Sequence, residues 1–133
     1  MENLGLTGGS GTVTNNITSV VVNCTNLNLP AGYVSEGGLT WMPVTSANTG
    51  NWSDANSFCA SFNGLGLSGW RMPTLPEMNA LSSSLEMNGQ GWTLLGTWSS
   101  TPYSAGLHYI VRLSDDNVGA NPDTLLDLVS CVH

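Results

Sequence analysis

Two helix signals that come before a run of strand-like segments restrict the fold of this chain more than any other feature. A first helix is predicted over residues 52–62, because Asn51 is a suitable N-cap and apolar residues then recur at i, i+3, i+4 and i+7. A second helix starts at a capping box between Thr74 and Glu77 and ends in the serine run at 82–84. Helices followed by strands are typical of an α+β fold with an antiparallel sheet.

The predicted strands are short and rich in β-branched and aromatic residues. They are residues 39–42, 97–101, 107–113 and 125–132. Between the last two lies a stretch of Asp, Asn and Gly at 115–123, for which the sequence predicts a polar loop.

The first 37 residues differ in character from the rest of the chain. They contain glycine-rich turns and two β-branched runs, at 12–14 and 17–24. We interpret residues 1–37 as a β-rich stalk or lead-in segment, or as an edge strand of the main domain, and residues 38–133 as one domain. No signal peptide is recognisable, so we expect a fragment of a longer exported protein, with a cytosolic protein as the alternative.

The composition excludes several classes of function. Only 8% of the residues are charged, against about 25% in ordinary globular domains, and the net charge is -7 with Arg71 and Arg112 as the only cations. Such a chain has no basic patch for nucleic acid, anionic lipid or sulfated glycans. No stretch approaches the roughly 20 apolar residues of a membrane span. A polar surface with few charges favours an extracellular or cell-surface protein.

No catalytic set can be named, and we expect that the protein is not an enzyme. His108 and His133 are the only histidines, and the sequence has no nucleophile elbow, P-loop or dinucleotide fingerprint. The three cysteines Cys24, Cys59 and Cys131 have no zinc spacing. Their odd number allows one disulfide and one further thiol.

Two features point to binding, and each has a structural alternative. Asp115, Asp116 and Asp123 could supply oxygens to calcium, although the sequence favours a plain Asx-rich loop over a calcium site. Five tryptophans could stack on sugars or fill the core. No cofactor other than calcium is indicated.

An ordered set of short motifs runs through residues 38–133. These are Leu39-Thr40-Trp41, Asn51-Trp52-Ser53-Asp54-Ala55 with Cys59, Trp70-Arg71-Met72-Pro73-Thr74 with Glu77-Met78, Trp98-Ser99-Ser100-Thr101, and Cys131-Val132-His133. In this order they resemble the Lcl C-terminal domain family, named after a bacterial collagen-like adhesin.

The resemblance implies a C-type-lectin-like fold, akin to the formylglycine-generating enzyme superfamily, and a disulfide between Cys59 and Cys131. Cys24 would then be unpaired or bonded elsewhere. In such a fold Arg71 is expected to pair with a buried carboxylate such as Glu77. Ser130 departs from the family's Arg before the last Cys, and the acidic charge argues against the glycosaminoglycan binding suggested for the adhesin.

In this fold the ligand is expected at the segment between the Trp98 strand and the last strand. The candidate ligand-binding residues are Tyr103, His108, Asp115, Asp116, Asn117, Asn121 and Asp123. We expect an extracellular adhesin or receptor-binding domain that recognises a surface glycan, as at a pilus or fibre tip. The alternatives are a structural or oligomerisation cap of a fibre and a formylglycine-type oxidase.

Overall fold

The structure, a computed structural model, describes residues 29–133. The strands predicted at 12–14 and 17–24 lie outside these residues. The elements are β1 (Val34–Glu36), β2 (Leu39–Trp41), β3 (Thr49–Gly50), α2 (Trp52–Ser61), the 3-10 turn η2 (Gly64–Gly66), α3 (Leu75–Ser84), β4 (Gly96–Ser104), β5 (Leu107–Arg112), β6 (Asn117–Pro122) and β7 (Asp127–Leu128). Within the described residues no helix has the length and apolarity to cross a bilayer.

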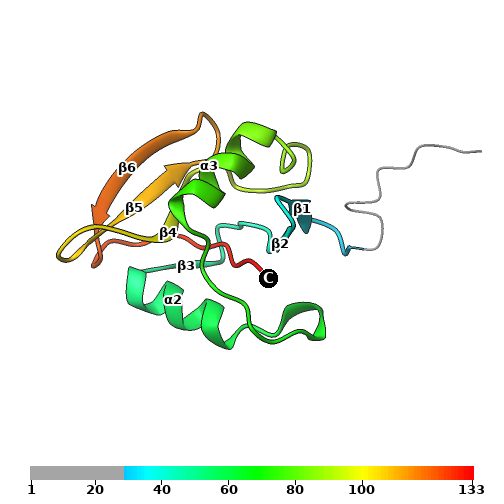
Figure 1. Cartoon of the computed structure of the whole chain (residues 1–133), viewed down its shortest axis with the longest axis horizontal. Helices are drawn as coiled ribbons and strands as arrows, with labels where there is room; N and C mark the ends of the chain where they lie inside the picture. The colour runs from blue at the N-terminus through cyan, green and yellow to red at the C-terminus, as the bar shows by residue number, and fades with distance from the viewer. Residues whose placement is uncertain (1–28) are drawn as a thin grey trace, which may run out of the picture.

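The main sheet has five strands in the order β3-β7-β4-β5-β6, and β1 and β2 form a separate hairpin (Figure 1). β5 pairs antiparallel with β4 and with β6, and β3 pairs antiparallel with β7, whereas β7 runs parallel to β4 at Thr97 and Leu128. The α+β architecture predicted from the sequence is therefore confirmed. The compact part of the chain begins before residue 38, because Val34 of this hairpin is fully buried.

Two segments have a secondary structure that differs from the prediction. Residues 117–122, predicted as part of a polar loop, form β6, because pairing with β5 along six residues outweighs the weak strand propensity of Asn, Gly and Pro. In the apolar segment 125–132 only Asp127–Leu128 is a strand. Val132 instead makes isolated bridges to Trp41 and Arg71.

Both helices begin where the sequence predicts. The Asn51 side chain accepts a hydrogen bond from the Asp54 backbone N–H at 2.8 Å, and this N-cap starts α2. At α3, the Glu77 carboxylate accepts from the Thr74 N–H at 2.8 Å and the Thr74 hydroxyl accepts from the Glu77 N–H at 3.4 Å, which completes the capping box. Each helix is thus fixed at its N-terminus by local side chains.

The helices cover opposite faces of the sheet. Met78 and Leu81 of α3 pack in one buried cluster with Val111, whereas Cys59 of α2 packs in a second cluster that Ile110 adjoins. Since successive residues of a strand point to opposite faces, β5 separates the two clusters. The C-terminal segment contributes to both clusters and ends near the β1–β2 hairpin (Figure 1).

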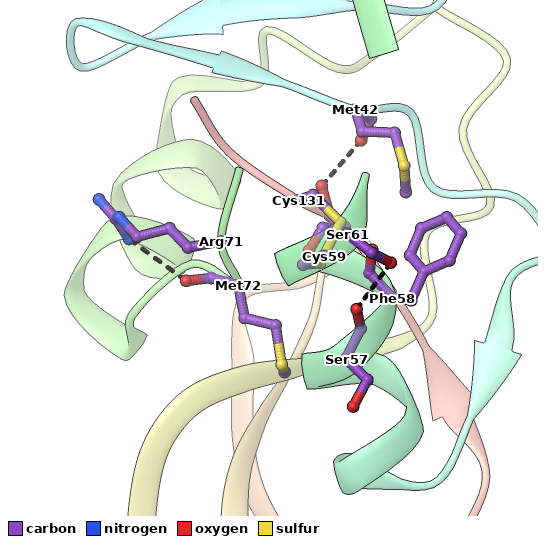
Figure 2. The surroundings of a disulfide bond; sticks show 9 residues. Met42, Ser57, Phe58, Cys59, Ser61, Arg71, Met72 and Cys131 are labelled. Atoms are coloured by element: carbon purple, nitrogen blue, oxygen red, sulfur yellow. Dashed lines mark hydrogen bonds between the residues drawn. A yellow bond between two sulfur atoms is a disulfide. The ribbon is translucent and has the colours of Figure 1, made fainter. Parts of the chain in front are cut away.

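The disulfide implied by the family resemblance is present between Cys59 and Cys131, two fully buried residues 72 positions apart. Figure 2 shows that it joins α2 to the C-terminal segment beside Met42. The Met42 N–H donates to the Cys131 carbonyl at 2.8 Å, so a backbone contact holds the same segment. α2 is therefore tied to the end of the chain covalently.

All five tryptophans are structural. Each indole N–H donates to a backbone carbonyl, and Trp41 and Trp98 are fully buried. The acceptors are the carbonyls of Glu36, Ser99, Gly64, Gly32 and Gly50, for Trp41, Trp52, Trp70, Trp92 and Trp98 respectively. Of the two interpretations of the tryptophans, core packing therefore accounts for them.

Arg71 pairs with Glu77, as expected, but at the surface instead of in the interior. Two hydrogen bonds of 2.8 Å join the guanidinium to the carboxylate, with the side chains 49% and 27% exposed. The bond from Arg71, with the capping hydrogen bonds of Thr74, lowers the pKa of Glu77 to about 2.

This pair makes stability depend on pH. The pKa of Glu77 falls from 4.5 to about 2 on folding, so its contribution is present above pH 4.5 and is lost as the pH falls toward 2. We expect Glu77→Gln to show a smaller loss of unfolding free energy than the wild type between about pH 6 and pH 3 in urea titrations. Gln keeps an oxygen for the Thr74 N–H, so the comparison isolates the charge. Parallel pH profiles would contradict this assignment.

Candidate functional site

The predicted residues near the β4–β5 turn separate onto two faces of the hairpin. The His108 Nδ1 lies 2.7 Å from an Asp123 carboxylate oxygen, and its ring stacks on Trp52 with centroids 3.8 Å apart. Tyr103 is instead 58% exposed and meets Tyr109 edge to face at 5.3 Å. His108 and Asp123 thus link β5 to the end of β6, whereas Tyr103 remains available at the surface.

The remaining predicted acids lie at the β5–β6 turn. Asp115 accepts hydrogen bonds of 3.1 and 2.8 Å from Arg112 and another from the Asn117 N–H, and the ion pair lowers the pKa of Asp115. Asp116 has a positive φ of 60° and accepts from the Ser83 hydroxyl at 3.3 Å. These carboxylates stabilise the turn and its contact with α3.

The structure does not bring the predicted calcium ligands together. Asp115 and Asp116 precede β6 and Asp123 follows it, so the length of a six-residue strand, roughly 20 Å, separates them. In residues 29–133 no three His, Cys, Asp or Glu side chains form a group suited to a metal ion. The prediction of a shared site at these three residues is wrong, because the segment is a strand and not a loop that could fold around an ion.

A groove of about 430 Å³ opens elsewhere on the sheet, and its volume lies in the range of ligand sites, about 300–1,000 Å³. It is lined by Leu95, Gly96, Ile110, Arg112, Asn117, Val118, Gly119 and Asp127. A Cβ at Gly96 would lie 3.3 Å from Ile110 and 3.4 Å from the Asp127 carboxylate. Because Gly96 has no side chain, the groove stays open at this position.

Asp127 is the polar centre of this groove. The Asn121 side-chain amide donates to its carboxylate at 2.7 Å. Burial raises the pKa of Asp127, and the hydrogen bond from Asn121 opposes this shift. The two arginines of the chain pair with other acids, Arg71 with Glu77 and Arg112 with Asp115. Asp127 thus offers a carboxylate and a neighbouring amide over an apolar floor formed by Ile110.

The groove and its central acid involve two of the predicted residues and several residues that the sequence did not indicate. Asn117 lines it and Asn121 binds its central acid, but Asp127, Ile110 and Leu95 were not expected there. The sequence predicts an apolar terminal strand at 125–132, and a single acid within it does not indicate a binding site. The position of the groove follows only from the strand register. In that register Gly96 lies opposite Arg112, and Gly119 lies opposite Ile110.

Comparisons with known proteins agree with this architecture. The adhesin InvE of Yersinia pseudotuberculosis matches with a TM-score of 0.57 and 16% identity, over 75% of this chain and 34% of that one, so this chain spans about a third of that structure. Botrocetin matches with a TM-score of 0.56 and 12% identity, over 80% of this chain and 98% of that one. The fold is therefore C-type-lectin-like, as the motifs implied.

No curated protein matches the chain in sequence. The model of the Lcl C-terminal domain family, however, matches residues 35–133. This range includes both helices, the disulfide and every strand of the main sheet. The chain belongs to the Lcl C-terminal domain family.

Proposed function

We propose that this protein is a non-catalytic extracellular binding domain that recognises an uncharged surface glycan in the groove around Asp127. The observation that carries the proposal is the Asp127–Asn121 pair, 2.7 Å apart, beside an open groove with an apolar floor. A carboxylate and an amide together accept from and donate to sugar hydroxyls, while Ile110 can contact the apolar face of a ring.

The charge of the chain supports the choice of an uncharged ligand. The net charge is -7, and Arg112, the only cation at the groove, is paired with Asp115. Sulfated or otherwise anionic sugars would meet repulsion without compensation. A neutral glycan needs no cation, because hydrogen bonds to its hydroxyls are sufficient.

The disulfide and the family support a location outside the cytosol. Disulfides persist in oxidising compartments, and Cys59 and Cys131 are bonded and fully buried. One structural neighbour, InvE, is an adhesin. We propose a place on the cell surface, as at the tip of a fibre or pilus.

The same cysteines favour a binding domain over an oxidase of the formylglycine type. Oxidase chemistry at cysteine needs a reactive, accessible thiol. Cys59 and Cys131 form the buried disulfide, which leaves Cys24 outside the described residues. The His108 ring, stacked on Trp52 and bound to Asp123, has a structural role that accounts for it without catalysis.

Glycan arrays followed by titration of a hit test the proposal. We expect Asp127→Ala to weaken binding about tenfold or more, since a hydrogen bond to a charged group contributes about 1.5–3 kcal/mol. Tyr103→Ala, a change at the exposed end of β4, should leave binding unchanged. Chelation of divalent cations should also have no effect, because the groove uses hydrogen bonds directly.

The reverse mutational pattern would contradict the assignment of the site. Loss of binding in Tyr103→Ala with none in Asp127→Ala would move the glycan to the β4–β5 turn. A folded protein that binds no glycan and forms a stable oligomer would favour the competing function, a structural cap of a fibre.

A further inference from the structure

The outer edge of β6 has no neighbouring strand among residues 29–133. β6 is the last strand in the sheet order and pairs only with β5 among residues 29–133. Asn117, Val118, Gly119 and Pro122 are exposed, and Ala120 and Asn121 are half-buried. An edge strand presents unpaired N–H and C=O groups, which can accept a further strand.

β6 lacks most features that protect sheet edges. Proteins blunt such edges with lysines, bulges, very short strands or proline. β6 has six residues in unbroken register with β5, contains no lysine, and has its one proline at the terminal position 122. By contrast, the opposite edge strand, β3, has two residues and lies against α2 (Figure 1).

Acidic residues flank this edge at both ends. Asp115 and Asp116 precede β6 and Asp123 follows it. Arg112 pairs with Asp115, and the His108 ring binds one oxygen of Asp123, so Asp116 and the second oxygen of Asp123 face no cationic side chain among residues 29–133. An antiparallel pair of two β6 strands would bring the acidic turn of one copy toward Asp123 of the other. Like charges that face each other across strands are destabilising, so a second copy is a poor partner for this edge.

We propose that β6 is a docking edge for an extended, basic segment of a partner protein, which adds to the main sheet as a sixth strand. Backbone hydrogen bonds to β6 would supply the affinity. Lysine or arginine side chains of the partner would meet Asp116 at one end and Asp123 at the other. This edge adjoins the glycan groove, which Asn117, Val118 and Gly119 also line, but docking would use the backbone of β6 and not the Asp127 carboxylate.

Titration of the isotope-labelled full chain with a synthetic peptide tests the proposal. The probe is an acetylated and amidated peptide of three Lys-Val repeats. Its control has the same charge but a proline in place of the central valine. We expect the probe to shift the backbone amide resonances of residues 117–121 saturably and to slow their hydrogen exchange. The proline peptide should bind about tenfold more weakly, because it lacks a donor and resists strand geometry.

A pair of matched variants separates edge pairing from general attraction. Val118→Lys places a positive charge on the edge, and Leu126→Lys makes the same charge change at a residue that is 71% exposed and outside β6. Only Val118→Lys should abolish the resonance shifts and the slower hydrogen exchange that the peptide causes at residues 117–121. Both sites are exposed, so both variants should fold.

Several outcomes would overturn the proposal. Equal binding of both peptides, equal losses in both variants, or resonance shifts only outside residues 117–121 would each show that the edge does not accept a strand. Slow hydrogen exchange, in the protein without peptide, of those amides of residues 117–121 that point away from β5 would show that residues 1–28 or a second copy already covers the edge. Sedimentation analysis would then distinguish those two occupants.

Discussion

Replacement of Cys59 and Cys131 by alanine is expected to lower the free energy of unfolding by about 4 kcal/mol. The bond joins residues 72 positions apart, so it removes a large part of the conformational freedom of the unfolded chain. Natural domains are stable by about 5–15 kcal/mol, so this loss would leave the protein close to its unfolding threshold.

Urea titrations of the wild type, the double variant and Cys24→Ser measure this effect. Cys24→Ser should keep the wild-type midpoint, because the Cys59–Cys131 bond does not involve it. A reductant should shift the wild type toward the double variant and leave the double variant unchanged. An equal midpoint for the wild type and the double variant would show that the disulfide contributes little to stability.

Trp98→Ala should cost about 3–5 kcal/mol, the range for truncation of a buried large aromatic side chain. Trp98 is fully buried between the sheet and α2, and its indole N–H donates to the Gly50 carbonyl at 2.8 Å. The substitution removes apolar volume and also leaves a buried carbonyl without its donor. Both losses act in the same direction.

Tyr103→Ala is the matched control, since Tyr103 lies on the same strand but is 58% exposed. Its effect on the free energy of unfolding should stay within about 1 kcal/mol, as for most surface substitutions. Chemical denaturation followed by far-ultraviolet circular dichroism suits both variants, because the four tryptophans of one variant and the five of the other would complicate a fluorescence signal. Equal costs at the two positions would contradict the assignment of Trp98 to the core.

The elements that the sequence predicts well are those specified by local contacts. The start of α2 depends on Asn51 and Asp54, three residues apart, and that of α3 on Thr74 and Glu77, also three apart. Such short-range hydrogen bonds leave a recognisable pattern in the sequence. The Cys59–Cys131 bond came from a different source, the resemblance to a family, since three cysteines alone permit other pairings.

β6 and the groove depend instead on contacts between distant segments. Asn117–Pro122 has weak strand propensity and becomes a strand because β5 lies beside it in register. The groove needs Gly96 of β4, Gly119 of β6 and Asp127 of β7 at one place, and no local pattern relates these positions. The calcium prediction failed for the same reason, since the acids at 115–123 are close along the chain but lie at opposite ends of β6.

The place of the C-terminal segment between the two buried clusters has a consequence for biosynthesis. His133 pairs with Thr40 through backbone hydrogen bonds, and Cys131 must reach Cys59. If the chain enters an oxidising compartment from its N-terminal side, these residues arrive after every other part of the domain, so neither the core nor the disulfide can close earlier. During that interval Cys24 is the only other thiol in the chain, and a temporary Cys24–Cys59 bond would have to be exchanged before the native one forms.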